Sequence, residues 1–269
     1  MNLRDEINLR NLSFAASRKL LHERSDGSCP AVIYGRDEHG RHGNFHPTVD
    51  TAICANPVWA RRLDKVHTAS RRTRLRANWQ WKELDTASSS DALLMNIFCH
   101  PEVMACSSVC SMLGVKRNAM LHFGFKPRIP LQSGAVDATE IDLSIDTLLI
   151  EAKLTESNFQ CAKPSLVARY RDIESVFHLT ELPQRNGKHT GYQLIRNTLA
   201  AYALGLSFSV FCDARRPDLI EEWYRILSAV RSLDFCSRLK LLTWQELAST
   251  LPADLQDFLI IKYGIFPKN

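Results

Sequence analysis

Hydrophobic and polar positions repeat with two different periods from about residue 88 onward. In residues 88–98, Ser and Asp precede apolar residues at helical spacing, which predicts a helix with a good N-cap. Residues 191–204 also have a helical pattern and end at Gly205, a common helix stop. Apolar runs that are bounded by turn residues predict strands at 140–145, 148–154 and 206–212.

The remaining elements follow from shorter signals. Pro217 is a typical first residue of a helix, and Thr243 with Glu246 forms a capping-box pattern for a last helix. The other expected elements are a short helix in 101–114, an extended segment in 120–130, a helix near 165–176 and a strand at 238–243.

The order of these elements predicts an α/β fold. A helix between strands 148–154 and 206–212 suits a parallel crossover, whereas a tight turn at Asp146-Thr147 suits an antiparallel hairpin. We therefore expect a mixed β-sheet that is flanked by helices. Residues 83–269 are expected to form one compact α/β domain, and residues 1–82 a basic, mostly irregular N-terminal extension.

The hairpin carries charged residues on strands that look buried. Side chains alternate along a strand, so Glu151 and Lys153 share one face. With a two-residue turn, Asp142 pairs with Glu151 directly across the hairpin, where two carboxylates repel each other. A divalent cation between them would remove the repulsion, and oxygen ligands suit Mg²⁺ or Mn²⁺. The alternative is a surface hairpin with one polar face.

Asp142 followed by Glu151-Ala152-Lys153 resembles the metal site of the PD-(D/E)xK nuclease superfamily, which has the restriction-endonuclease-like fold. The family core is a helix, three strands, a helix and a strand, in the order expected for residues 88–212. The resemblance implies that Asp142 and Glu151 bind metal and that Lys153 assists the attacking water. Ile141 stands where the family name has proline.

Some members of this superfamily carry a glutamine on the crossover helix, and Gln193 takes that place here. Arg196 lies about one turn later, where a solvated helix face is an equal alternative. Asn197 stands where the recombination-nuclease branch often has tyrosine, which argues against close kinship with that branch. Some members also have an acidic residue on the first helix, for which Glu83 is a weak candidate because it precedes the predicted helix.

Residues 61–82 hold eight Lys and Arg but one acidic residue, with Trp79 and Trp81 among them. Such charge is suited to phosphate contacts and tryptophan to base stacking, although a solvated face with packed tryptophans is equally consistent. The candidate nucleic-acid-binding residues are Arg71, Arg72, Arg74 and Arg76.

The other polar clusters are less specific. His39, His42 and His46 are spaced loosely with Asp37 and Asp50 nearby, and a polar loop is more consistent with this spacing than a metal site. The eight cysteines contain no CxxC and favour reduced thiols in a cytoplasmic protein. The N-terminal residues 1–14 are too charged for a signal peptide, so none is expected, and no apolar run approaches the roughly 20 residues of a membrane span.

These observations predict a Mg²⁺- or Mn²⁺-dependent nuclease that hydrolyses phosphodiester bonds, most readily in DNA. The alternative is a catalytically inactive nuclease-like domain that serves as a nucleic-acid-binding or assembly subunit. Substrate form, sequence specificity, pathway and oligomeric state cannot be derived from these patterns.

Overall fold

The computed structural model describes residues 2–25, 30–66 and 81–268. These residues form two compact units. Unit 1 comprises residues 1–112 together with 245–269, and unit 2 comprises residues 113–244. The division differs from the boundary expected at residue 82, and a functional division at that residue stays a prediction.

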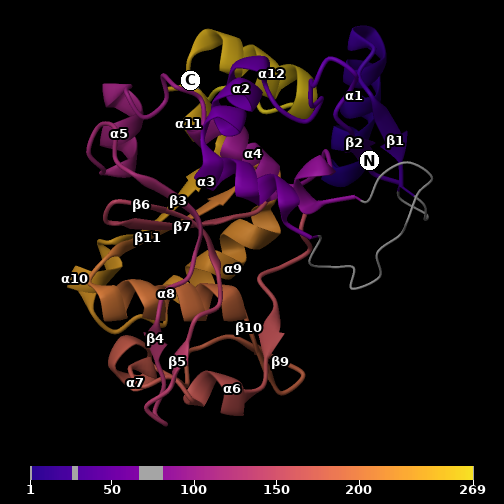
Figure 1. The fold of residues 1–269 in the computed structure, drawn as a ribbon. Coiled ribbons are helices and arrows are strands. Elements are labelled where there is room, and N and C mark those ends of the chain that lie inside the picture. The colour runs from indigo at the N-terminus through magenta and orange to yellow at the C-terminus, as the bar shows by residue number, and fades with distance from the viewer. Residues whose placement is uncertain (1, 26–29, 67–80, 269) are drawn as a thin grey trace. The chain divides into compact units, whose positions relative to one another are not determined.

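A five-stranded mixed sheet forms the centre of unit 2, with strand order β12-β11-β7-β6-β3 (Figure 1). Both pairs β3–β6 and β6–β7 are antiparallel, whereas β7, β11 and β12 run parallel. The expected hairpin and the expected parallel crossover are both confirmed. The strands are β3 Leu121–Phe125, β6 Ile141–Ile145, β7 Leu148–Ala152, β11 Ser207–Cys212 and β12 Leu239–Thr243.

Helices α8 and α9 pack against this sheet. Their apolar residues join those of β7 and β11 in one core that includes Leu149, Leu194 and Phe208. Helix α8 starts after Gly191, whose φ of 65° is left-handed and where a Cβ would meet Ile226 at 3.0 Å. The helices of unit 2 are α6 Pro164–Ala168, α7 Ile173–Val176, α8 Tyr192–Leu204, α9 Pro217–Leu227 and α10 Leu233–Cys236.

Short strands form two further small sheets in unit 2, which the hydrophobic pattern did not predict. The helix expected near 165–176 is two short helices, α6 and α7, because Tyr170 pairs with Leu131 in an isolated bridge between them. The small sheets are β4-β5 and β8-β10-β9, formed by β4 Ile129–Pro130, β5 Val136–Asp137, β8 Cys161–Ala162, β9 Gln184–Arg185 and β10 Lys188–Thr190.

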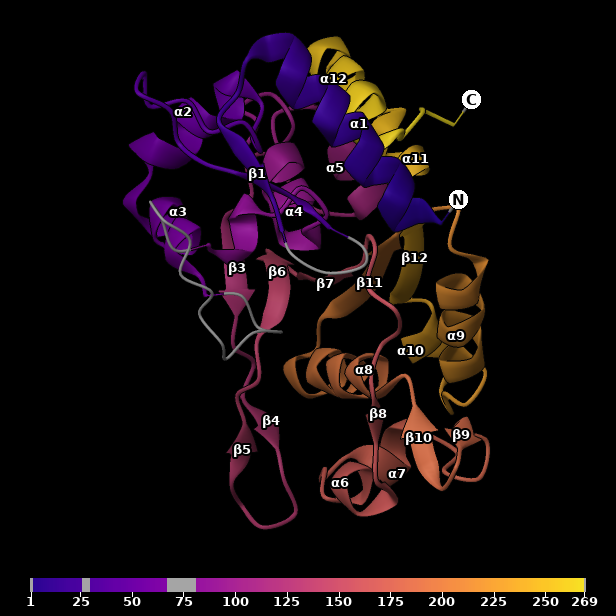
Figure 2. The same cartoon turned by 90° about the vertical axis from the view of Figure 1, so that its right-hand side faces the viewer.

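Unit 1 is mainly helical, so the expectation of a mostly irregular segment over residues 1–82 is wrong for its first part. Helix α1 lies alongside α12 in Figures 1 and 2, and Phe14 contacts Phe258 with ring centroids 5.8 Å apart. The elements are α1 Leu3–Arg18, β1 His22–Arg24, β2 Val32–Tyr34, α2 Pro47–Ala55, α3 Pro57–Ala60, η1 Arg61–Asp64, η2 Glu83–Asp85, α4 Ser90–Phe98, α5 Ser107–Leu113, α11 Trp244–Ala248 and α12 Ala253–Tyr263.

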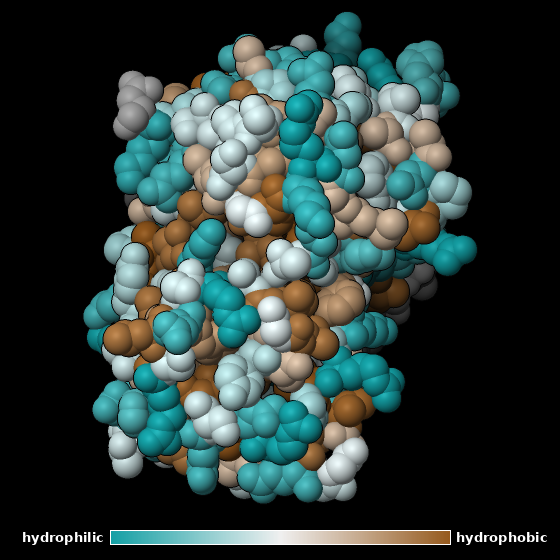
Figure 3. Space-filling model, turned by 90° about the vertical axis from the view of Figure 1, so that its left-hand side faces the viewer, coloured by the Kyte–Doolittle hydropathy of each residue, from teal (hydrophilic) through white to brown (hydrophobic). Residues whose placement is uncertain are grey.

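The surface mixes apolar and polar side chains. The face in Figure 3 shows brown and teal side chains interspersed, and single exposed apolar residues such as Val58 and Leu233 need no special explanation. None of the helices in the described part of the chain has the length and apolar character needed to cross a membrane.

Candidate active site

The β6–β7 hairpin has the register that a two-residue turn predicts. Ile145 pairs with Leu148, and Leu143 pairs with Ile150, where the paired residues end. Beyond this pair the backbone N–H of Ala152 donates to the Asp142 carboxylate, and the charges of Asp142 and Glu151 both act on Lys153. The two predicted metal ligands and Lys153 therefore lie near one another at the end of this hairpin.

The Glu151 carboxylate is buried, with 1% of its side chain exposed, and both of its oxygens accept hydrogen bonds. Lys153 Nζ lies 2.7 Å and Gln193 Nε2 lies 2.9 Å from Oε1. Asn197 Nδ2 donates to Oε2 at 2.7 Å. Because Gln193 and Asn197 are four residues apart on α8, one helix face presents both amides to the carboxylate. These donors compensate for burial of the charge, and a surface hairpin is excluded.

Lys153 lies in the field of three carboxylates. Burial alone would lower the pKa of this side chain, but the charges of Glu151, Asp142 and Glu156 outweigh it and raise the pKa above that of an ordinary lysine. Lys153 is therefore an ammonium ion at neutral pH. The carboxylates of Glu151, Asp142 and Glu156 therefore all lie near this one ammonium group.

Asp142 occupies the end of the hairpin ladder. Its Oδ2 accepts a hydrogen bond from the backbone N–H of Ala152 at 2.8 Å, and its side chain is half-buried. This bond fixes the carboxylate beside β7, just beyond the last paired residues. Asp142 and Glu151 therefore offer carboxylate oxygens near each other, and oxygen atoms are the ligands that would suit a hard divalent cation.

Arg196 supports the Glu151 site through Asn197. Its Nε donates to Oδ1 of Asn197 at 3.1 Å, and its guanidinium also reaches the backbone oxygen of Glu140. The first bond occupies the oxygen of the Asn197 amide, so that the NH₂ group is directed to Glu151. Arg196 is buried at 5% exposure, so it is not part of a solvated helix face.

Glu83 is not part of this group of residues in unit 2. Glu83 lies on η2 of unit 1, where its charge contributes to the raised pKa of Lys65. The predicted nucleic-acid-binding residues all lie outside the described residues, and their role stays a prediction; they are Arg71, Arg72, Arg74 and Arg76.

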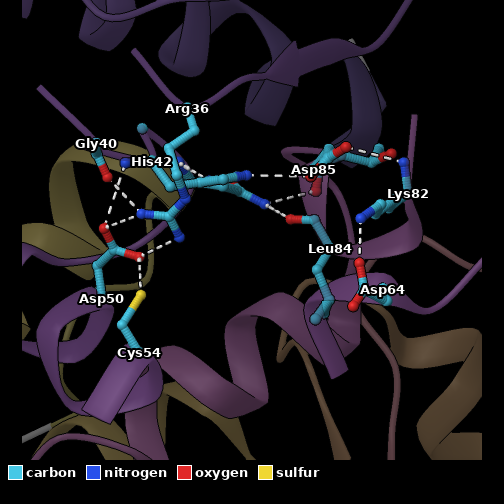
Figure 4. A network of polar contacts seen from close by, with 12 residues as sticks. Arg36, Gly40, His42, Asp50, Cys54, Asp64, Lys82, Leu84 and Asp85 are labelled. Carbon is cyan, nitrogen blue, oxygen red and sulfur yellow. Dashed lines mark hydrogen bonds and ion pairs between the residues drawn. The ribbon is translucent and has the colours of Figure 1, made fainter. Parts of the chain in front are cut away.

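The loop histidines do not gather around one ion. His42 Nε2 contacts Asp85 Oδ1 at 3.1 Å, and Asp50 forms a two-pronged ion pair with Arg36 (Figure 4). His39 is exposed. His46 lies elsewhere, close to His100 and Asp254. The expected polar loop is therefore held by separate ion pairs.

Two residues near the site are not among those that the sequence pattern predicts. In the sequence, Asn197 is notable only because the recombination-nuclease branch often has tyrosine at this position. Its spacing of four residues from Gln193 nevertheless indicates a shared helix face. Glu156 follows β7, and its Oε2 accepts the backbone N–H of Leu154 at 2.6 Å. Nothing in the hydrophobic pattern indicates that this loop residue turns back toward Lys153.

A family model described as "Restriction Endonuclease associating with ARP" matches residues 15–264. The chain belongs to this family, because the match covers most of its length. Membership confirms the resemblance to restriction endonucleases and the fold class, a mixed α/β sheet flanked by helices, and it indicates a nuclease-type domain. No curated protein and no solved structure matches the chain.

Proposed function

We propose that this member of a restriction-endonuclease family is a divalent-metal-dependent nuclease that hydrolyses phosphodiester bonds in DNA. The observation that supports the proposal most directly is the group of Asp142, Glu151 and Lys153 at the end of the β6–β7 hairpin. A buried glutamate that takes hydrogen bonds from three side chains is expensive to maintain for stability alone.

Each residue has a separate role in the proposed reaction. Asp142 and Glu151 would hold Mg²⁺ or Mn²⁺, which supplies a water of lowered pKa and charge compensation at the phosphate. Lys153 carries a positive charge that can orient that water or stabilise charge on the phosphate oxygens. Gln193 and Asn197 restrict the orientation of the Glu151 carboxylate and are positioning residues.

The binding partner in this proposal is DNA, with the basic residues 61–82 as the contributing segment. The description of the family, a restriction endonuclease, favours DNA over RNA. Lys and Arg exceed Asp and Glu in the whole chain by 34 to 29, and the excess is N-terminal. An N-terminal basic segment beside a nuclease-type domain suits a polyanionic substrate.

The second candidate is a nuclease-like domain that binds nucleic acid without cutting it. Fold alone does not distinguish the two, because the same fold supports different roles. The Lys153–Glu151 contact favours the enzyme, since a binding domain has no need of a buried acid and lysine together with Asp142.

A cleavage assay distinguishes them. The full chain is incubated with supercoiled plasmid, linear duplex, branched DNA, single-stranded DNA and RNA, with Mg²⁺, Mn²⁺ or EDTA. We expect wild type to cut DNA with either metal and not in EDTA, and Asp142→Asn to be inactive. Glu174→Gln, a change of the same type at an exposed position in unit 2, is the matched control and should cut normally. Binding without cutting any substrate would favour the second candidate.

A further inference from the structure

A second cluster of ligand-type side chains lies in unit 1. His46 precedes α2, His100 follows α4, and Asp254 belongs to the first turn of α12, so three distant segments contribute one residue each. Their ligand atoms all lie within 4.8 Å of one another. None of the three is part of the proposed nuclease site.

Both histidines lie near the same carboxylate oxygen, at distances close to those between two ligands of one metal ion. His100 Nε2 lies 3.4 Å and His46 Nε2 lies 3.7 Å from the same oxygen, Oδ2 of Asp254. A good hydrogen bond between such groups is about 2.7–3.0 Å long. Two ligands bound tetrahedrally at about 2.0–2.1 Å from Zn²⁺ are about 3.3 Å apart. A small contraction of the cluster around one ion would complete the coordination.

His46 is held in place, but its ring is poorly satisfied. Its backbone N–H donates to Asn96 Oδ1 at 2.8 Å, and its ring packs edge-on against Phe258. Nδ1 of this ring is buried with no hydrogen-bond partner among the described residues. Nε2 lies 3.7 Å from Asp254 Oδ2, beyond hydrogen-bond distance, so the ring proton can reside on Nδ1 and leave Nε2 to bind a metal.

His100 is buried and fixed on the other side of the cluster, with 3% exposure. The backbone N–H of Glu102 lies 3.4 Å from its Nδ1, which favours a proton on Nε2 in the metal-free protein. A neutral ring carries one proton, so metal binding at Nε2 requires that proton to move to Nδ1, where it would face the Glu102 N–H. This change of tautomer releases no proton and lowers the affinity for the metal.

The cluster borders a cavity of about 660 Å³ within unit 1. His46 and Asp254 line the cavity, as do His39, Asp50 and Asp257. Three protein ligands leave one position of a tetrahedral ion unfilled, and in metalloenzymes that position takes water or a substrate. Here the unfilled position would face the cavity.

We propose that His46, His100 and Asp254 bind a transition-metal ion of the Zn²⁺ type, with an open coordination position toward this cavity. Two imidazoles and one carboxylate differ from the oxygen ligands Asp142 and Glu151, so the two sites select different metals. The ion would join α2, α4 and α12, and would bind an anion or water from the cavity in its open position.

The test uses the full chain, stripped of metal with EDTA and then dialysed. Zn²⁺ is titrated by calorimetry, and Co²⁺ binding is followed by its visible d–d absorption. We expect one nitrogen- and oxygen-bound Co²⁺ per chain, without the near-ultraviolet band of cobalt–thiolate bonds. His46→Gln and Asp254→Asn should each weaken binding at least about tenfold. Zn²⁺ should also raise the Tm of wild type and not of these variants.

Control variants separate this site from others. His39→Ala and Asp257→Asn alter the same cavity outside the cluster and should bind Zn²⁺ as wild type does. Asp142→Asn should also leave the Co²⁺ spectrum unchanged. Absence of Zn²⁺ binding to wild type, wild-type affinity in both His46→Gln and Asp254→Asn, or an equal loss in the controls would overturn the proposal. Circular dichroism of each variant shows that it is folded.

Discussion

Lys153 Nζ lies 2.7 Å from Glu151 Oε1, and both side chains are buried. A buried ion pair of this kind contributes little by its net energy, but losing one partner leaves the other charge uncompensated. The pair therefore links stability to the proposed chemistry, because the charge that stabilises Glu151 is also the charge offered to a phosphate.

Replacing Lys153 by Met should destabilise unit 2 strongly. Glu151 would keep its two amide donors but lose its cation, and breaking a buried pair costs about 3–5 kcal/mol. Urea denaturation measures the loss. Lys163→Met, at an exposed lysine, is the matched control and should change stability by no more than about 0.5 kcal/mol.

A double variant tests the origin of this loss. The double variant Glu151→Gln/Lys153→Met no longer contains the uncompensated charge. Its loss of unfolding free energy should therefore be smaller than the sum of the losses in the two single variants. Equal effects of Lys153→Met and Lys163→Met would contradict the assignment of Lys153 as the buried counter-ion.

Asn197 should prove a positioning residue for Glu151. Asn197→Ala removes the 2.7 Å bond to Oε2 and should cost about 1–3 kcal/mol. Asn197→Asp should cost more, because it sets a second carboxylate against the first. Thermal denaturation gives the order of stability, and an aspartate variant more stable than the alanine variant would contradict this geometry.

The Mg²⁺ dependence of cleavage by the same variants distinguishes positioning of Glu151 from a purely structural role of Asn197. If Asn197 orients the Glu151 carboxylate, Asn197→Ala should raise the Mg²⁺ concentration needed for half-maximal cleavage. Thr198→Ala is the control on the same helix, since Thr198 is equally buried. Its Mg²⁺ requirement should match that of wild type.

The hairpin and the crossover helix were predictable because local rules determine them. A two-residue turn at Asp146 sets the register, and strand alternation then brings Glu151 and Lys153 to one face. What alternation could not show is that this face is buried under α8. The donors from Gln193 and Asn197 come from a helix about forty residues later, and only the tertiary fold brings them to Glu151.

Helix α1 shows why the N-terminal expectation was wrong. Its buried side includes Asn8 and Asn11, and these polar residues interrupt the apolar periodicity by which a helix is recognised in a sequence. Asn11 Nδ2 donates to the backbone oxygen of Lys262, a residue 251 positions later. Long-range hydrogen bonds therefore make these polar positions suitable for burial, and no short sequence window contains that information.

The basic segment should contribute to DNA affinity through charge. Replacing Arg71, Arg72, Arg74 and Arg76 by Ala should weaken binding and flatten its dependence on salt, by roughly 0.9 in the log–log slope for each phosphate that is no longer neutralised. Fluorescence anisotropy at several salt concentrations measures both quantities.

The matched control for that segment removes four exposed cations elsewhere. The variant with Arg117, Lys163, Lys188 and Arg225 changed to Ala has the same net charge as the first variant. It should retain more affinity and a steeper salt slope. Identical behaviour of the two variants would show that only net charge matters, and that residues 61–82 have no specific role.

His189 should make unit 2 less stable in mild acid. Burial lowers the pKa of this histidine, and a hydrogen bond involving Pro183 offsets part of that effect. The unfolded chain therefore binds a proton at a higher pH than the folded chain, and stability falls as pH drops below about 6.5. Urea denaturation at pH 7.5 and 5.5 measures the slope.

His189→Gln should reduce that loss of stability between the two pH values. Burial also lowers the pKa of His46, so part of the slope should remain in this variant. His122→Gln, at an exposed position, is the control and should keep the wild-type slope. An unchanged slope in His189→Gln would show that His189 does not titrate differently on folding.

Asp142→Asn should separate binding from cleavage. An asparagine oxygen can still accept the Ala152 N–H bond, so the variant keeps the hairpin geometry while it loses one ligand charge. In EDTA no metal offsets the Asp142 carboxylate, which should repel the DNA phosphates, and the variant removes this charge. We therefore expect Asp142→Asn to bind DNA in EDTA as tightly as wild type or more tightly, while cutting none with Mg²⁺. Lys153→Ala should also stop cleavage, but it removes a favourable charge and should not strengthen binding.

Anisotropy titrations in EDTA and in Ca²⁺ measure the affinity of each variant for DNA. If Asp142→Asn binds more weakly than wild type in EDTA, or cuts as well with Mg²⁺, Asp142 is not a ligand of the catalytic metal.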